Sequence, residues 1–289
     1  MSNLALGTAQ FGSPYGIANR AGRIPRADAI AILERAYTSG VATLDTAIDY
    51  GQAEQELGEI GVAGWQVISK LPAVPESCSN VAAWVRKSVQ GSLERLRIPR
   101  LYGLLLHRPQ QLLESRGLEL YRALIELRDA GMTEKIGVSI YDPDILASLG
   151  TGFQADIVQA PFSIVDRRLA NSGWLDKLHA AGTEVHVRSI FLQGLLLMKR
   201  GDRPAKFAPW QSLWDRWDKW LEGEGLSALQ GCLQLVRSQP GIDRIVVGID
   251  NIGQLEQILR CLVHPVSVRP AELACEDLNL IDPSRWSSF

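Results

Sequence analysis

Short apolar runs and longer amphipathic stretches alternate along the whole chain. Eight runs have the length and composition of buried strands: residues 3–9, 41–46, 65–70, 101–107, 134–139, 155–160, 183–189 and 243–248. Stretches with helical spacing lie between them, at residues 26–39, 53–62, 79–97, 117–131, 142–149, 168–181, 226–238 and 252–263. In the first stretch, four apolar residues at i, i+3, i+4 and i+7 share one helix face: Ala29, Ile32, Leu33 and Ala36.

Strands that alternate with helices imply parallel pairing with right-handed crossovers. Eight such units predict a closed (β/α)8 barrel, and 289 residues suit one barrel of about 250 residues. An open doubly wound sheet is the competing fold, but no G-x-G-x-x-G follows the first strand. We therefore expect residues 1–289 to form a single barrel domain.

One segment interrupts the alternation between the seventh and eighth strands. Residues 208–225, "APWQSLWDRWDKWLEGEG", hold four of the eight tryptophans and predict an added helix. After the last stretch with helical spacing, the chain ends in a short extension that includes "DLNLIDPSRWSSF".

Composition and charge narrow the class of protein. The chain is 46% hydrophobic and 21% charged with a net charge of −2, so it offers no basic field for nucleic acid or for a membrane surface. Neither a signal peptide nor an 18-residue apolar run is evident, so we expect a cytoplasmic protein. The four cysteines include no C-x-x-C pair and are no disulfide framework.

Polar side chains end nearly every predicted strand. In a (β/α)8 barrel the active site lies at these carboxyl ends, which here carry Asp45, Lys70, His107, Ser139, Gln159 and Arg188. The period-2 alternation of a strand sends Lys70 and His107 toward one barrel mouth if their faces point inward. Tyr50, just past the second strand, can lean over the same mouth.

Four of these residues suit one reaction. Taken singly, each has an ordinary reading: a satisfied core His, a solvated Lys, a packing Tyr. Together, Asp45, Tyr50, Lys70 and His107 at the ends of three successive strands indicate a site. A phenol has an ordinary pKa near 10, and a nearby ammonium favours its ionised form, so a lysine makes it a better acid. With an Asp to pair the Lys and a His to orient a carbonyl oxygen, the set suits hydride addition from a nicotinamide.

The sequence resembles the aldo-keto reductases over nearly its whole length. "LDTAIDYGQAEQELG" matches their D-T-A-x-x-Y-G-x-x-E-x-x-L-G signature, and "VISKLP", "LLLHRP", "EKIGVS" and "DIVQAPFSI" follow in the family's order. The resemblance implies a tetrad of Asp45, Tyr50, Lys70 and His107, with Tyr50 as general acid. It also implies that Ser139 and Gln159 hold the nicotinamide carboxamide and that Gly7 and Thr8 lie beside it. Tyr15 either lines the substrate pocket or only packs.

The resemblance places the rest of the cofactor on two segments. After the seventh strand these residues are Arg188, Ser189, Phe191, Gln193 and Gly194; after the eighth they are Gly248, Ile249, Asp250, Asn251 and Gln254. The second segment opens a helix, whose N-terminal N–H groups suit a phosphate.

The choice between NAD(H) and NADP(H) rests on the second segment. NADPH-dependent relatives place Lys and Arg where this chain has Gly248 and Gln254, and Asp250 here would repel a 2′-phosphate. In the alternative reading, Asp250 or Asn251 only caps the helix. The loop favours NADH, whereas the family's general habit is NADPH.

Three departures from the family pattern stand out. Ile140 replaces an Asn that contacts the carboxamide in many members, and Arg188 replaces a Tyr that stacks on the nicotinamide. A planar guanidinium can also stack on a ring. The usual long C-terminal loop is missing, so we expect an open substrate pocket.

The leading interpretation is a reductase of small aldehydes or ketones, including sugar-like ones, without a metal. A dinucleotide-binding regulatory barrel with slow or vestigial catalysis is the alternative, and the tryptophan-rich insert leaves room for a protein partner. A hydrolase or isomerase is a third reading, which no carboxylate pair or metal cluster at the strand ends supports.

Overall fold

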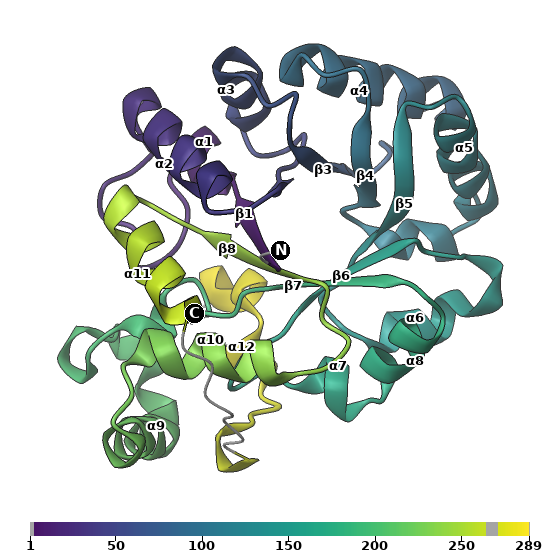
Figure 1. The fold of residues 1–289 in the computed structure, drawn as a ribbon. Helices are drawn as coiled ribbons and strands as arrows, with labels where there is room; N and C mark the ends of the chain where they lie inside the picture. The colour runs from purple at the N-terminus through teal and green to yellow at the C-terminus, as the bar shows by residue number, and fades with distance from the viewer. Residues whose placement is uncertain (1–2, 264–270, 289) are drawn as a thin grey trace.

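The computed structural model describes residues 3–263 and 271–288 and shows a closed barrel of eight parallel strands. The strands are β1 (Leu4–Gly7), β2 (Thr43–Asp45), β3 (Gln66–Leu71), β4 (Leu101–Leu106), β5 (Thr133–Ser139), β6 (Ile157–Pro161), β7 (Glu184–Arg188) and β8 (Arg244–Gly248). β1 closes the barrel, because Leu6 lies opposite both Leu44 of β2 and Val247 of β8 (Figure 1). The predicted fold is confirmed.

Helices form an outer ring around the strands (Figure 1). They are the single turn α1 (Ala9–Gly12), α2 (Arg26–Thr38), α3 (Ala53–Ile60), α4 (Val81–Leu96), α5 (Gly117–Asp129), α6 (Asp144–Leu149), α7 (Arg168–Asn171), α8 (Trp174–Ala180), α10 (Ala228–Ser238) and α11 (Ile252–Val263). The continuous helix predicted over residues 168–181 is wrong. Gly173 has a φ of 74°, in the left-handed region, so the helix stops there and α8 begins anew.

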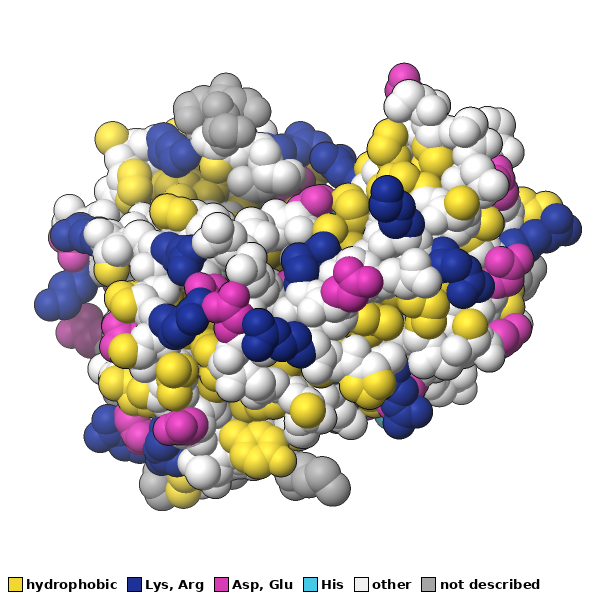
Figure 2. Space-filling view, turned by 90° about the horizontal axis from the view of Figure 1, so that it is seen from above, with side chains coloured by type: hydrophobic (Ala, Val, Ile, Leu, Met, Phe, Trp, Pro, Cys, Tyr) yellow, Lys and Arg dark blue, Asp and Glu magenta, His cyan; other side chains and the backbone are white. Residues whose placement is uncertain are grey.

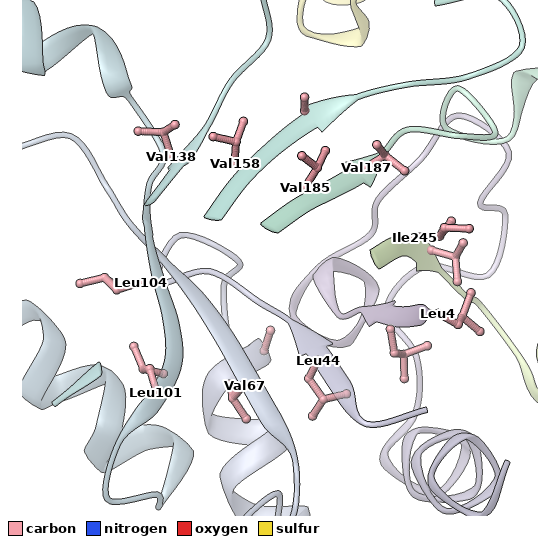
Figure 3. Packing of buried hydrophobic residues seen from close by; sticks show 14 of the residues in the cluster. Leu4, Leu44, Val67, Leu101, Leu104, Val138, Val158, Val185, Val187 and Ile245 are labelled. Atoms are coloured by element: carbon pink, nitrogen blue, oxygen red, sulfur yellow. The ribbon is translucent and has the colours of Figure 1, made fainter. Parts of the chain in front are cut away.

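Strand alternation divides the apolar residues between two cores. Outward-facing Leu, Val and Ile from successive strands point away from the barrel interior and meet the helices (Figure 3). Ile68, Leu105 and Ile157 form a separate small cluster on the opposite strand faces, inside the barrel. Gly103 gives this cluster its room, because a Cβ there would lie 2.7 Å from Ile157 Cδ1.

A polar network occupies the barrel near the amino ends of β4, β5 and β7. Glu184 accepts hydrogen bonds from the Tyr102 hydroxyl at 2.6 Å and from Lys135, and it contacts His186 at 3.1 Å. Burial raises the pKa of Glu184, but these three partners outweigh it and bring that pKa down to about 2. Paired polar groups therefore fill this end, and the opposite end is left for a cleft.

The predicted tryptophan-rich helix is confirmed as α9 (Gln211–Glu224), and Trp210 ends the turn before it. The described part of the C-terminal extension, which includes α12 (Leu278–Ile281), packs beside it. Trp286 lies edge-on to Phe207 with ring centroids 4.9 Å apart, and the Trp210 indole N–H donates to Asp277 at 3.1 Å. The C-terminal segment thus covers the α9 region.

Charged side chains of both signs are interspersed on the face drawn in Figure 2. Over the described ranges, the structure contains no helix of the length and apolarity that a membrane span requires.

Two helical glycines should respond oppositely to alanine. A Cβ at Gly58 in α3 would lie 1.9 Å from the carbonyl oxygen of Arg95, whereas one at Gly223 in α9 meets nothing within 4 Å. We expect Gly58→Ala to lower the free energy of unfolding by about 1–3 kcal/mol, because α3 and α4 must separate. Gly223→Ala should raise it by up to about 1 kcal/mol, since alanine is the better helix former. Urea unfolding measures both, and changes of the same sign would contradict this packing.

Candidate active site

A buried ion pair lies at the carboxyl ends of β2 and β3. Lys70 Nζ donates to Asp45 Oδ1 at 2.6 Å and to the carbonyl oxygen of Thr46 at 2.9 Å. Lys70 is 1% exposed and Asp45 3%. Burial alone lowers the pKa of the Lys70 ammonium, but the Asp45 carboxylate outweighs burial and raises it, so Lys70 stays charged.

Two further strand-end side chains complete the surroundings of this pair. Gln159 Nε2 donates to the second carboxylate oxygen of Asp45 at 2.6 Å, and Ser139 Oγ donates to Gln159 Oε1 at 3.2 Å. Both are buried. The structure therefore links side chains from β2, β3, β5 and β6 in one network, in which Gln159 holds the Asp45 carboxylate.

Tyr50 follows β2 and leans over the ion pair. Lys70 Nζ lies 5.0 Å from the centre of its ring. The loop is held close to the β1 turn, because a Cβ at Gly12 would lie only 1.7 Å from the Tyr50 carbonyl oxygen. The start of α3 is anchored by buried Glu54, which accepts from Ser69 at 2.6 Å and from Arg95 at 2.6 Å. The network thus fixes the helix that begins three residues after Tyr50.

His107 lies against Tyr50 just past β4. The two ring centroids are 6.0 Å apart at an interplanar angle of 77°, and the His107 backbone N–H donates to the Leu71 carbonyl oxygen at 3.0 Å. Burial, followed by the charges of Lys70 and Arg188, lowers the pKa of His107 to about 4. The imidazole is therefore neutral at physiological pH and has one N–H to donate.

A cleft of about 510 Å³ opens beside these residues. The residues named from the sequence that line it are Gly7, Thr8, Tyr15, Asp45, Tyr50, Arg188, Ser189, Phe191, Gln193, Gly194, Gly248, Asp250 and Gln254. Those that do not line it are Lys70, His107, Ser139, Gln159, Ile249 and Asn251. The described residues of the C-terminal extension contribute nothing to its walls.

The loop after β7 forms one wall in an uncommon backbone conformation. Ser189, Leu192 and Gln193 have φ values of 61°, 49° and 52°, three of the four non-glycine residues with positive φ in the described ranges. Such conformations cost about 1–3 kcal/mol each and cluster at functional sites. Gly194 lets this loop approach the β1 loop, because a Cβ there would lie 2.5 Å from the Cβ of Ala18.

In the turn between β8 and α11, Asn251 and Asp250 make different contacts, so the structure shows which of them caps the helix. Asn251 Oδ1 accepts from the backbone N–H of Gln254 at 3.0 Å, so Asn251 caps the helix. The Asp250 carboxylate instead accepts from Asn19 at 3.1 Å and from Gln254 Nε2 at 3.3 Å. Asp250 thus remains a carboxylate on the cleft wall, held in place by two amides.

Sequence reasoning missed several residues of this site. Gln10 is buried against Gly248, Asn19 holds Asp250, and the Tyr141 ring lies 4.3 Å below the Arg188 guanidinium. Gln10 stands two positions after Thr8, and that position could have indicated it from the sequence. Asn19 precedes Gly22 in a turn-like stretch, and its Oδ1 does accept from the Gly22 N–H at 2.8 Å. No local pattern pointed to Tyr141.

No group of three or more His, Cys, Asp or Glu that could hold a metal ion occurs among the residues that the structure describes.

The chain is thus a (β/α)8 barrel with ionisable side chains gathered where active sites of such barrels lie. The sequence model of the aldo/keto reductase family matches residues 3–269, so the chain belongs to that family. Its members are nicotinamide-dependent oxidoreductases, and the expected family is confirmed.

Known proteins similar to this chain agree with that placement. A 2,5-diketo-D-gluconic acid reductase B from Corynebacterium sp. (strain SHS752001) is 30% identical over 128 residues, 42% of this chain and 44% of that protein. The match therefore spans less than half the length of this curated relative.

Solved structures show the same fold. An aldo-keto reductase from Bacillus halodurans, in its holo form, has a TM-score of 0.73 at 20% identity, over 94% of this chain and 90% of that one. A protein from Pseudomonas aeruginosa assigned to the aldo-keto reductases has a TM-score of 0.66 at 23% identity, over 90% and 89%. At such identities the likeness establishes the fold alone.

The pKa of His107 gives a pH-dependent stability. An unfolded histidine takes up its proton near pH 6.5, whereas folded His107 does so only near pH 4. Its contribution is therefore fully present above pH 6.5 and is lost as pH falls toward 4. We expect wild type to lose about 1–2 kcal/mol more free energy of unfolding between pH 7.5 and 5 than His107→Gln. Urea titrations at both pH values test this, and parallel losses would show that His107 titrates normally.

Proposed function

We propose that this chain reduces small aldehydes or ketones to alcohols with a nicotinamide cofactor, with Tyr50 as the general acid. The observation that carries the proposal is the buried Lys70–Asp45 pair, with Lys70 Nζ 5.0 Å from the Tyr50 ring centre and neutral His107 beside it. A barrel of this family with such a set at its mouth suits protonation of a carbonyl oxygen.

Each residue of the set has a distinct task. The reduced nicotinamide, when bound, supplies the hydride. Tyr50 donates its proton to the carbonyl oxygen, and the Lys70 ammonium stabilises the negative charge left on the phenol. Asp45 and the Thr46 carbonyl oxygen hold Lys70 in position. The single N–H of His107 orients the carbonyl oxygen.

The cleft walls suit a dinucleotide. Gly7 and Gly248 line the cleft, and the N-terminus of α11 offers N–H groups and a favourable dipole to a phosphate. In this arrangement Ser189, Phe191, Gln193 and Gly194 would flank the cofactor. Ser139 and Gln159, which are buried and do not line the cleft, would hold the carboxamide from behind the cleft wall. Arg188 would also hold the nicotinamide through its planar guanidinium, one face of which Tyr141 covers.

The cofactor in this proposal is NADH rather than NADPH. Asp250 lines the cleft near the helix N-terminus, where it can accept from a ribose 2′-hydroxyl and repel a 2′-phosphate. Asn19 and Gln254 hold its carboxylate in place, and neither residue adds a positive charge.

The substrate and location complete the proposal. The name of the curated relative describes reduction of a keto sugar acid, which supports sugar-like carbonyl compounds here. A cytoplasmic location suits the four cysteines, all of which are unpaired. We propose that residues 1–289 form one domain, because the tryptophan-rich helix and the described part of the C-terminal extension share a core.

Tyr50→Phe should lower kcat for carbonyl reduction about 100-fold or more and leave the Kd of the dinucleotide nearly unchanged. Only the proton donor is lost, and general acid catalysis contributes roughly 10²–10⁴-fold. Absorbance at 340 nm follows turnover, and protein fluorescence follows binding. Tyr37→Phe on α2 is the matched control and should retain full activity. A Tyr50→Phe variant with more than about a tenth of the wild-type rate would refute the assignment.

Asp250→Ser combined with Gln254→Arg should shift cofactor preference toward NADPH by about tenfold or more, because a repelling charge is replaced by an attracting one. The ratio of the two dissociation constants is the measured quantity. Asp176→Ser, on the exposed surface of α8, removes one negative charge elsewhere and should leave the ratio unchanged. Wild-type protein that binds NADPH more than tenfold tighter than NADH would contradict this view of the loop.

A further inference from the structure

Arg188 is a cation in the cleft without a carboxylate partner. It ends β7 and is half-buried on the cleft wall. Across residues 3–263 and 271–288, no carboxylate lies within 4.0 Å of its guanidinium nitrogens. Two other partly buried arginines do have such a partner: Arg168 pairs with Asp166 at 2.8 Å, and Arg203 pairs with Asp218 at 2.5 Å.

The guanidinium is nevertheless fixed in one orientation. It donates to the carbonyl oxygen of Ile140 at 3.0 Å and to Ser189 Oγ at 3.3 Å, and its Cζ lies 4.3 Å from the centre of the Tyr141 ring. All three partners are neutral. A guanidinium has five N–H donors, so these two bonds leave three for another acceptor. Holding the fork in advance lowers the entropic cost of binding a ligand with it.

The charge of Arg188 reaches the residues that would surround a substrate. It helps to lower the pKa of His107, after burial and Lys70, and it opposes the rise that burial causes in the pKa of Tyr15. Tyr15, 46% of which is exposed, lines the same cleft as Tyr50 and Arg188. Lys70 is neutralised by Asp45, and Arg188 is the only Lys or Arg among the described residues that line the cleft. Arg188 therefore supplies the positive potential of the cleft.

We propose that Arg188 binds a carboxylate of the substrate, so that this chain selects carbonyl compounds that also carry an acid group. The inference rests on the proposed reductase function and names its substrate class. A carboxylate matches the planar fork, and pairing in a half-buried site makes the hydrogen bonds charge-assisted. The N–H groups at the edge of the guanidinium bind the carboxylate, so its planar face remains free to stack on a ring.

Two substrates that differ only in charge test the proposal. 4-Oxobutanoate and its methyl ester present the same aldehyde with and without a negative charge. We expect wild type to favour the acid by about tenfold or more in kcat/KM, as a charge-assisted pair provides. Arg188→Met should abolish this preference, so that the ratio of kcat/KM for acid and ester falls to about one. A lost contact with the cofactor would lower both values alike and cancels in that ratio. Arg188→Lys should keep part of it, and Arg122→Met, an exposed charge on α5, should keep all of it.

Binding without turnover gives a second readout. Titration calorimetry with succinate, which cannot react, should show binding to wild type that weakens at least about fivefold in Arg188→Met. Equal losses for acid and ester in Arg188→Met, or no acid preference in wild type, would overturn the proposal. If wild type reduces neither aldehyde, the reductase function fails, and the succinate titration alone then decides whether Arg188 binds carboxylates. If Arg188→Met does not fold, Arg188→Ala takes its place. An undiminished preference of that variant for the acid over the ester would overturn the proposal.

Discussion

The buried ion pair between Lys70 and Asp45 is the interaction on which the rest of the site depends. Removing two charges from water costs several kcal/mol per ion, so such a pair persists only when its other hydrogen-bonding capacity is satisfied. Here the Thr46 carbonyl oxygen accepts from Lys70, and Gln159 donates to Asp45. These groups come from β2, β3 and β6, and only the closed barrel brings them together. The fold and the chemistry are therefore linked through one pair of charges.

The Lys70–Asp45 pair also influences the net charge of the site and the protonation of its neighbours. Because Asp45 neutralises Lys70 locally, the site can hold an ammonium near Tyr50 without a large net charge. His107 stays neutral, since burial and nearby cations, Lys70 and Arg188 foremost, oppose its protonation. Arg188 has no such counter-charge among the described residues. Lys70, neutralised by Asp45, thus lies near the Tyr50 phenol, whereas Arg188 lines the cleft with no counter-charge among the described residues. The two cations can therefore have different roles.

Local patterns in the sequence predicted the strands, the tryptophan-rich helix and the position of Lys70 at the barrel mouth, because period-2 alternation fixes which side chains face inward. The pairing of Asp45 with Lys70 followed from their opposite charges. The patterns failed where one residue overrides them, as Gly173 does when its positive φ divides the helix predicted over 168–181. They also could not show contacts between distant segments. Gln159 meets Asp45 across 114 positions, and no periodicity encodes such a pair. The roles of Glu54 and Gly58, which belong to the signature after Tyr50, depend on α4: Arg95 of α4 donates to Glu54 and lies close against Gly58.

The loop after β1 contacts both segments that line the far side of the cleft. Asn19 donates to Asp250, and Ala18 lies against Gly194, so this loop touches both segments expected to hold the dinucleotide. Asp250, which we propose reads the ribose, is then also one end of a hydrogen-bonded bridge to Asn19. Replacing Asp250 removes the bridge as well as the charge, and it changes the affinity for NADH and NADPH together. The ratio of the two affinities isolates the electrostatic part, because loss of the bridge affects both cofactors alike.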